Sequence, residues 1–219
     1  MSNSAAESHP RNGCEREESV LSETRRALGE EHPQTLAAML DLADCRWAQG
    51  RLIAARKLEE RVVAGRRRLL GEDHADTLKA IGKLAVTMAA QGELEEARLL
   101  QEDLVARRRR QFGDADLETL RAINNLAGTV AAQGDLGGAR ELVASVIVTV
   151  CREFGEEHPD SLTAMGNLAS ILWQGGEREE AYALQQQVVE MRRRLHGDSD
   201  PGALAAGSVL EMMERDTGF

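Results

Sequence analysis

A repeat of 42 residues runs through the chain and constrains its fold more than any other feature. An element of nine residues that begins with Leu or Phe recurs at this step without insertion or deletion, over residues 28–36, 70–78, 112–120 and 154–162. Two further series keep the same step: Gly50, Gly92, Gly134, Gly176 and Gly218, and Ala55, Ala97, Ala139 and Ala181. Because a fixed period of this length is typical of repeat architectures, we expect a stack of nearly identical units.

Each repeat contains two segments with helical periodicity. In residues 119–134 the apolar side chains recur at the spacing of one helix face, at Leu120, Ile123, Leu126, Ala127 and Val130. A second helical segment covers residues 94–112 and ends in four consecutive arginines. The glycines that follow Gln49, Gln91 and Gln133 suit a left-handed turn between the two helices. The sequence therefore predicts helix pairs joined by tight glycine turns.

Composition agrees with an all-α fold. Ala and Leu together supply 58 of 219 residues, whereas aromatic residues make up 3%. Ala and Leu favour helices, and the aromatic and β-branched residues that favour strands are scarce. We predict ten helices and no β-sheet.

The expected organisation is a single solenoid with a half repeat at each end. Residues 1–13 are predicted to be a disordered N-terminal tail, and residues 14–219 the solenoid. Within it we predict a lone second helix, four full repeats and a lone first helix, over residues 14–28, 29–70, 71–112, 113–154, 155–196 and 197–219. Polar residues could solvate the two ends. The alternative is that the chain is cut from, or docks onto, something longer.

Charge and cysteine usage exclude several classes of function. The net charge of -10 gives no overall attraction to nucleic acid, and no apolar stretch is long enough to cross a membrane. Cys14, Cys45 and Cys151 are odd in number and show no metal-binding spacing. We therefore expect neither a disulfide framework nor a metal site, and a cytoplasmic location.

The segments FGEEHPDSLTAMGNLASIL and RAINNLAGTVAAQGDLGGAR resemble the 42-residue tetratricopeptide repeats of the kinesin light chain. The resemblance covers about residues 14–218. It implies a right-handed superhelical solenoid of antiparallel helix pairs. It also implies that the first helix of each pair lines a concave groove, which binds a peptide or a segment of a partner protein.

Alignment with the family pattern gives candidate groove residues: Trp47, Lys79, Arg121, Asn124, Ser170 and Trp173. The paired asparagines of the family, which hold a bound peptide's backbone, are complete here at residues 124–125 alone. The remaining floor is small and apolar and is flanked by Trp47 and Trp173. An equally favoured alternative is that both tryptophans pack within their own repeats.

Other conspicuous residues have structural interpretations. His32, His74 and His158 recur with the repeat, which favours a helix-entry role over a metal cluster. The basic runs at residues 66–68, 107–110 and 192–194 lack interleaved aromatic residues, so solvated helix ends are favoured over RNA binding. Arg46 stands where the other repeats have apolar residues and marks either a local contact or a tolerated edge position.

The function expected from these observations is a non-enzymatic scaffold or adaptor that binds a peptide or protein without a cofactor. One alternative is a regulatory module that docks through its terminal half repeats within a larger assembly, with end-to-end self-association as one form of it. Another is an enzyme with an unrecognised site. The second alternative requires convergent titratable groups that interrupt the period, and the sequence contains no such interruption.

Overall fold

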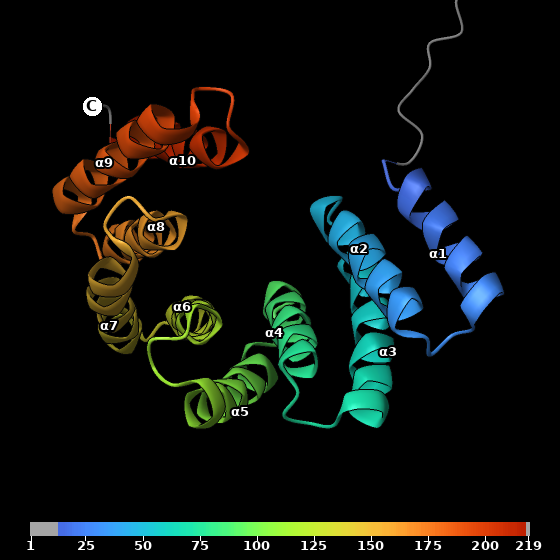
Figure 1. The fold of residues 1–219 in the computed structure, drawn as a ribbon. Helices are drawn as coiled ribbons and strands as arrows, with labels where there is room; N and C mark the ends of the chain where they lie inside the picture. The colour runs from blue at the N-terminus through green and yellow to red at the C-terminus, as the bar shows by residue number, and fades with distance from the viewer. Residues whose placement is uncertain (1–12, 218–219) are drawn as a thin grey trace, which may run out of the picture. The chain divides into compact units, whose positions relative to one another are not determined.

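The computed structural model describes residues 13–217, which form ten α-helices and no strand (Figure 1). The helices are α1 (Glu15–Leu28), α2 (Pro33–Ala48), α3 (Leu52–Leu70), α4 (Ala75–Ala90), α5 (Leu94–Phe112), α6 (Leu117–Ala132), α7 (Leu136–Phe154), α8 (Pro159–Gln174), α9 (Arg178–His196) and α10 (Pro201–Thr217). The predicted all-α repeat fold is therefore confirmed.

The chain divides between Glu93 and Leu94 into two compact units. The N-terminal unit contains α1 to α4 and the C-terminal unit contains α5 to α10. Within each unit, consecutive helices pack against one another, as Figure 1 shows. The predicted single solenoid stays a prediction, and residues 1–12 of the predicted tail lie outside the described residues.

Histidines start three of the first helices, as the repeat predicted. The Nδ1 atoms of His32, His74 and His158 each accept a hydrogen bond from the backbone N–H two residues further on, at 3.1–3.2 Å. In the third repeat Asp116 takes this place, and its carboxylate accepts from the N–H of Thr119 at 2.8 Å. These side chains pair N–H groups that the first helical turn leaves without a backbone partner.

Glycines end the first helices in the predicted left-handed conformation. Gly50, Gly92, Gly134 and Gly176 have φ angles between 72° and 92°. A side chain is strained in this region of backbone space, whereas glycine adopts it freely. The turn between the helices of a pair is therefore fixed by residue type.

The core consists of the predicted apolar stripes and of small residues where helices lie close. All five stripe residues of α6 are buried. Ala55, Ala97, Ala139 and Ala181 have no exposed surface. Because the small alanine side chain lets backbones approach closely, its recurrence at one position keeps the helix spacing constant from repeat to repeat.

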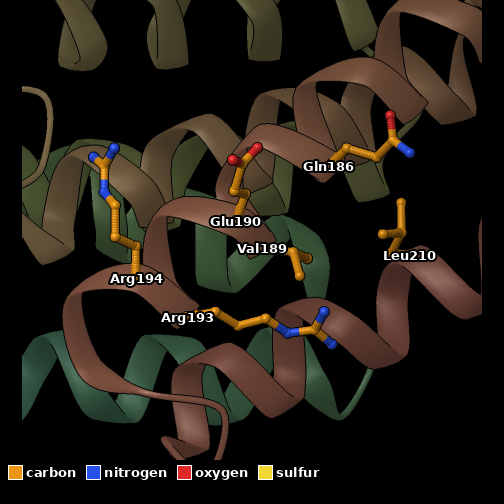
Figure 2. A pocket seen from close by; sticks show the side chains of 6 residues that line it. All are labelled: Gln186, Val189, Glu190, Arg193, Arg194 and Leu210. Carbon is orange, nitrogen blue, oxygen red and sulfur yellow. The ribbon is translucent and has the colours of Figure 1, made fainter.

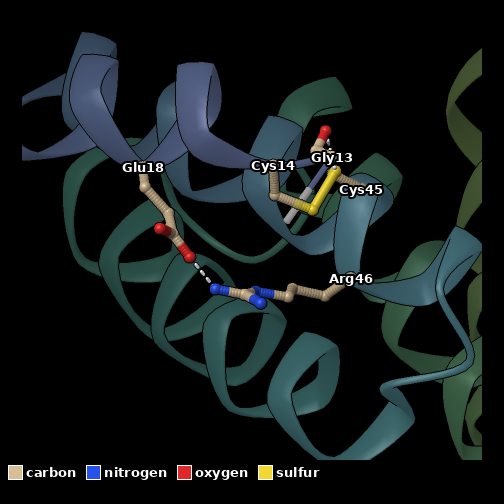
Figure 3. Close-up of a disulfide and its surroundings, with 5 residues drawn as sticks. All are labelled: Gly13, Cys14, Glu18, Cys45 and Arg46. Atoms are coloured by element: carbon tan, nitrogen blue, oxygen red, sulfur yellow. Dashed lines mark hydrogen bonds and ion pairs between the residues drawn. A yellow bond between two sulfur atoms is a disulfide. The ribbon is translucent and has the colours of Figure 1, made fainter. Parts of the chain in front are cut away.

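A disulfide joins Cys14 at the start of α1 to Cys45 in α2 (Figure 3). The expectation of no disulfide was therefore wrong. The two cysteines are 31 residues apart in sequence, and their Cα atoms are 5.8 Å apart. Each occupies an ordinary repeat position, so their pairing follows from which helix faces meet and not from a recognisable cysteine spacing.

Arg46, the residue after Cys45, forms an ion pair with Glu18, which lies one turn after Cys14 (Figure 3). Its side chain is largely buried against α1, at a position that Met88, Val130 and Leu172 occupy in the other repeats. The irregular residue therefore marks a local contact, which was one of the two interpretations of the sequence.

The interpretation of the basic runs as solvated helix ends was wrong for Arg108. Its side chain is buried, lies 3.5 Å from the Asp116 carboxylate and 3.8 Å from Glu118, and stacks over the Phe112 ring. Arg109, the next residue, is exposed and pairs with Asp114 at 2.8 Å. Consecutive residues of an α-helix point about 100° apart around its axis, so only part of the run meets solvent.

Candidate functional site

A cleft of about 220 Å³ opens between α8, α9 and α10 in the C-terminal unit. Three helices supply its lining, which consists of Leu162, Thr163, Gly166, Asn167, Ser170, Gln185, Val188, Arg192, Gly202, Ala205, Ala206 and Val209. Ser170 is one of the groove residues predicted from the family pattern.

Small residues keep this cleft open. Gly166 and Gly202 lack side chains, and Ala205 and Ala206 project only a methyl group. A Cβ added to Gly166 would have the Gln185 Oε1 atom as its nearest neighbour, at 3.8 Å. The hydroxyl of Ser170 donates to the Gly166 carbonyl at 3.1 Å, so it is held against its own helix. The hollow is thus a property of the residue types and of two adjacent first helices.

Gln185 forms a polar floor in this otherwise small and apolar cleft. The side chain is buried, and its Nε2 atom donates to the Ala206 carbonyl at 2.8 Å. The Oε1 atom is buried and has no hydrogen-bond partner within the described residues. A buried acceptor without a partner costs about 1–3 kcal/mol, so a donor that entered the cleft would be stabilised there.

Arg192 supplies the positive charge of the cleft. Its Nη2 atom donates to the Thr163 hydroxyl at 2.9 Å, while its Nε atom is buried and lacks a partner among the described residues. The lining contains no acidic side chain, and the Asp200 carboxylate, which lies beside Gly202 near this guanidinium, accepts a hydrogen bond from the Ala203 N–H at 2.9 Å. A carboxylate or carbonyl oxygen would therefore be attracted to this end of the cleft.

The structure separates the two tryptophans predicted for the groove. Trp173 is 7% exposed and packs in a core cluster with Leu172, Ala181 and Met213. The Arg178 guanidinium covers its ring at 4.0 Å. Trp47 on α2 of the N-terminal unit is 44% exposed. Trp173 is therefore packed in the core, as the alternative interpretation of the tryptophans predicted, whereas Trp47 is exposed.

Arg121 is engaged in ion pairs. Its Nε and Nη2 atoms donate to the two carboxylate oxygens of Asp160 at 2.7 and 2.9 Å, and Nη1 donates to Glu118 at 2.6 Å. The hydrogen bond with Asp160 is the main reason that the Arg121 pKa lies above its ordinary value. These ion pairs link α6 to α8 and engage all three guanidinium nitrogens of Arg121 within the protein.

The two remaining candidates lie outside the cleft. Asn124 on α6 is buried, and its Oδ1 atom has no partner within the described residues. Lys79 lies exposed on α4 of the N-terminal unit. Among the six predicted groove residues, Ser170 is therefore the one that lines the cleft.

Sequence reasoning missed Gln185 and Arg192, because both belong to a second helix. The signal for Gln185 was its repeat position, where α3 and α5 also have a buried polar residue, Glu59 and Gln101, although α7 has Val143. Arg192 belonged to a basic run interpreted as solvated, which was wrong for a side chain that lines a cleft.

The sequence profile of the tetratricopeptide repeat family matches residues 47–110 and 118–194. The chain belongs to this family, in its kinesin-light-chain-like form. Proteins built from such repeats generally mediate protein–protein interaction and are typically non-enzymatic scaffolds.

Solved structures show the same repeats. A Podosopora anserina protein described as a kinesin light chain with nearly identical TPR-like repeats is 30% identical with a TM-score of 0.63, and the match covers 81% of this chain and 84% of that chain. A second structure of that protein is 29% identical with a TM-score of 0.61, over 82% and 85% of the two chains. BtubC (BKLC) from P. vanneervenii shares the fold, at 18% identity and a TM-score of 0.70 over 93% and 82%. No curated protein matches the chain.

Within residues 13–217, no cluster of three or more His, Cys, Asp or Glu residues is arranged to hold a metal ion. None of the described helices is both long and apolar enough to cross a membrane.

Proposed function

We propose that the chain is a non-enzymatic scaffold or adaptor that binds a segment of a partner protein in the cleft between α8, α9 and α10. The observation that carries this proposal is the unpartnered Oε1 atom of Gln185 at the floor of the cleft. A backbone N–H of an extended segment is a suitable donor for it. Membership of an interaction-mediating repeat family supports the proposal.

The dimensions favour a chain segment over a small molecule. Small-molecule pockets usually have volumes of about 300–1,000 Å³ and bury most of the ligand. This cleft has about 220 Å³ and is open. It therefore suits one small side chain of a segment that continues beyond it on both sides. A carboxylate or carbonyl of that segment would face Arg192.

The test begins with selection of peptides from a phage-displayed library against the full chain, followed by measurement of affinity by fluorescence anisotropy. Gly166→Leu fills the cleft and should reduce affinity at least tenfold. Gly137→Leu is the control, because this exposed glycine lies on α7, a second helix outside the cleft, where an added Cβ would have only the Asp135 carboxylate near it, at 3.8 Å. Equal loss in both variants, or no loss in Gly166→Leu, would contradict the proposal.

The second candidate function is docking through the terminal half repeats. It is favoured by exposed apolar residues at both ends, at positions that are buried inside the repeats, among them Val20 on α1 and Leu204 on α10. Deletion of either half repeat would abolish this mode. Peptide binding in the cleft would be lost only on deletion of the half repeat that contains α10.

The cellular compartment is a further prediction that the disulfide makes testable. Disulfides persist in oxidising compartments and are rare in the cytosol. In the cytoplasm, the location expected from the sequence, Cys14 and Cys45 would be thiols. Alkylation of free thiols in intact cells, followed by mass spectrometry, distinguishes three modified cysteines from one.

A further inference from the structure

The two terminal helices expose residues at positions that are buried everywhere else. Val20 on α1 is 42% exposed, whereas its counterparts at steps of 42 residues are at most 3% exposed: Val62, Leu104, Val146 and Val188. Leu204 on α10 is 57% exposed, and its counterparts are again at most 3% exposed: Leu36, Leu78, Leu120 and Leu162. Within residues 13–217, neither has the neighbouring helix that covers this position in the other repeats.

The fourth repeat shows which residues would cover them. Leu162 of α8 and Val188 of α9 belong to one core cluster. Leu204 is the counterpart of Leu162, and Val20 is the counterpart of Val188. If α1 of one copy lay on α10 of another as α9 lies on α8, Val20 would pack on Leu204.

The C-terminal end has an open place for such a helix. A hollow of about 680 Å³ lies between α9 and α10, and Figure 2 shows Val189 and Leu210 on its two sides. The counterpart of Leu210 is Leu168, which packs against a cluster that contains Ala181 of α9. In the fourth repeat, the second helix α9 therefore belongs to the cluster that covers Leu168. Helix α1 corresponds to such a second helix in the repeat pattern.

The N-terminal end has the complementary open place. A hollow of about 440 Å³ is lined by Arg16, Glu17, Val20, Ala38, Asp41 and Asp44 of α1 and α2. Four repeats later, the counterparts of Glu17, Val20 and Ala38 line the cleft that α8 closes. The missing wall at the N-terminal end is thus a first helix, which is the type of helix that α10 is.

Charges at the two ends are complementary in this register. Arg16 replaces Leu184, and Glu214 replaces Leu172. Leu184 packs against the cluster that contains Leu172, so the stacked arrangement would place Arg16 near Glu214.

A second pair has the same relation with the charges reversed. Glu23 replaces Met191, and Gly207 replaces Met165, two methionines that pack against one cluster. The Nη2 atom of Arg193 lies 3.6 Å from the place of a Cβ on Gly207. Glu23 of a second copy would therefore meet Arg193.

We propose that the partner of the terminal half repeats is a second copy of this chain, stacked head to tail with its α1 on the α9–α10 end. The contact completes a helix pair from two half repeats. It is heterologous, so each added copy presents a new free end and the assembly grows with concentration. This inference rests on the second candidate function and is independent of peptide binding in the cleft.

The test uses two full-length variants, Val20→Asp and Leu204→Asp, in sedimentation experiments over a concentration series. Both positions are exposed, so the fold should be retained, and circular dichroism checks this. The parent should grow in mass with concentration, and each variant alone should be a monomer. An equimolar mixture should form a dimer and nothing larger, because each variant keeps one intact end.

Ile53→Asp is the matched control at another exposed apolar position and should associate like the parent. A parent that stays monomeric at millimolar concentration would overturn the proposal. A single variant that still associates would overturn it as well, because association would then not need both ends. A mixture that stays monomeric would also overturn it, because the two intact ends would then not bind each other. Peptide affinity of the monomeric variants reports on the cleft separately.

Charge reversal is a second route that does not depend on apolar residues. Arg16→Glu should abolish association, and the double variant Arg16→Glu, Glu214→Arg should restore it, because the pair forms again between copies with reversed sign. If the Glu214 change disturbs α10, the pair Glu23→Arg and Arg193→Glu gives the same test. Failure of both double variants to restore association would overturn the proposed register.

Discussion

The N-terminal helix α1 and the C-terminal helix α10 lie at the two ends of the described chain, yet they are held by different interactions. Cys14 and Tyr182 occupy the same repeat position, and so do Cys45 and Met213. At the N-terminal end these positions form a disulfide between α1 and α2. At the C-terminal end Met213 is buried in a core cluster and Tyr182 packs against that cluster.

The polar contacts differ in the same way. Glu18 pairs with Arg46 at the N-terminal end. At their counterparts, the Gln186 amide donates to the Tyr182 hydroxyl at 3.1 Å, and that hydroxyl donates to Glu214 at 3.0 Å. Helix α1 has 14 residues and α10 has 17. The shorter helix offers less surface to bury, so a covalent link and an ion pair provide what packing provides for the longer helix.

The largest expected effect is the loss of packing at the C-terminal end. Met213→Ala removes a side chain with no exposed surface. Emptying such a site costs about 2–5 kcal/mol, so α10 should detach or the C-terminal unit should lose much of its stability. Urea denaturation and hydrogen exchange of α10 measure this effect. Met212→Ala, at the exposed neighbouring position, is the control and should change stability little.

Loss of the disulfide should have the next largest effect, and it should be local to the N-terminal end. Replacement of Cys14 and Cys45 by serine removes a cross-link over 31 residues, which is worth about 2–4 kcal/mol. Hydrogen exchange of α1 should increase strongly while α9 and α10 stay protected. Cys151→Ser changes the free cysteine and should have no such effect. Unchanged exchange in α1 would mean that packing alone holds it.

The two units differ in charge at one buried repeat position, where α3 of the N-terminal unit has Glu59 and α9 of the C-terminal unit has Gln185. Burial raises the pKa of Glu59, although its bond from the Thr87 hydroxyl opposes this. The unfolded chain therefore releases this proton at lower pH than the folded chain. Stability from this group is complete below the unfolded pKa and falls as pH rises to the folded pKa.

Glu59→Gln should therefore stabilise the N-terminal unit at neutral pH, by at most about 1.4 kcal/mol for each unit of pKa difference. Gln retains an acceptor for the Thr87 hydroxyl. Denaturation between pH 4 and pH 8 should show a flatter profile in the variant than in the parent. A parallel profile would contradict the assigned effect of burial.

The smallest effect is expected from the phenol network. Tyr182→Phe removes the hydroxyl between Gln186 and Glu214 and leaves the ring in place. A hydrogen bond of this kind contributes about 0.5–1.5 kcal/mol. The midpoint of denaturation should fall slightly, without the loss of α10 protection expected for Met213→Ala. An effect as large as that of Met213→Ala would show that polar contacts, and not packing, hold α10.

The sequence alone determined the helices, their turns and the faces that they bury. The repeat of 42 residues predicted ten helices, and residues 94–112 were predicted as the helix that the structure contains. The reason is that these features depend on local chemistry: apolar spacing, histidine and aspartate at helix starts, and glycine where φ is positive.

Only the tertiary structure decided which side chains meet. The disulfide, the burial of Arg108, the ion pairs of Arg121 and the cleft around Gln185 each join residues from different helices. Trp47 and Trp173 have the same place in the repeat, but one is exposed and the other covered by Arg178. A repeat pattern assigns every copy the same role, whereas a contact depends on the particular neighbours that packing brings within reach.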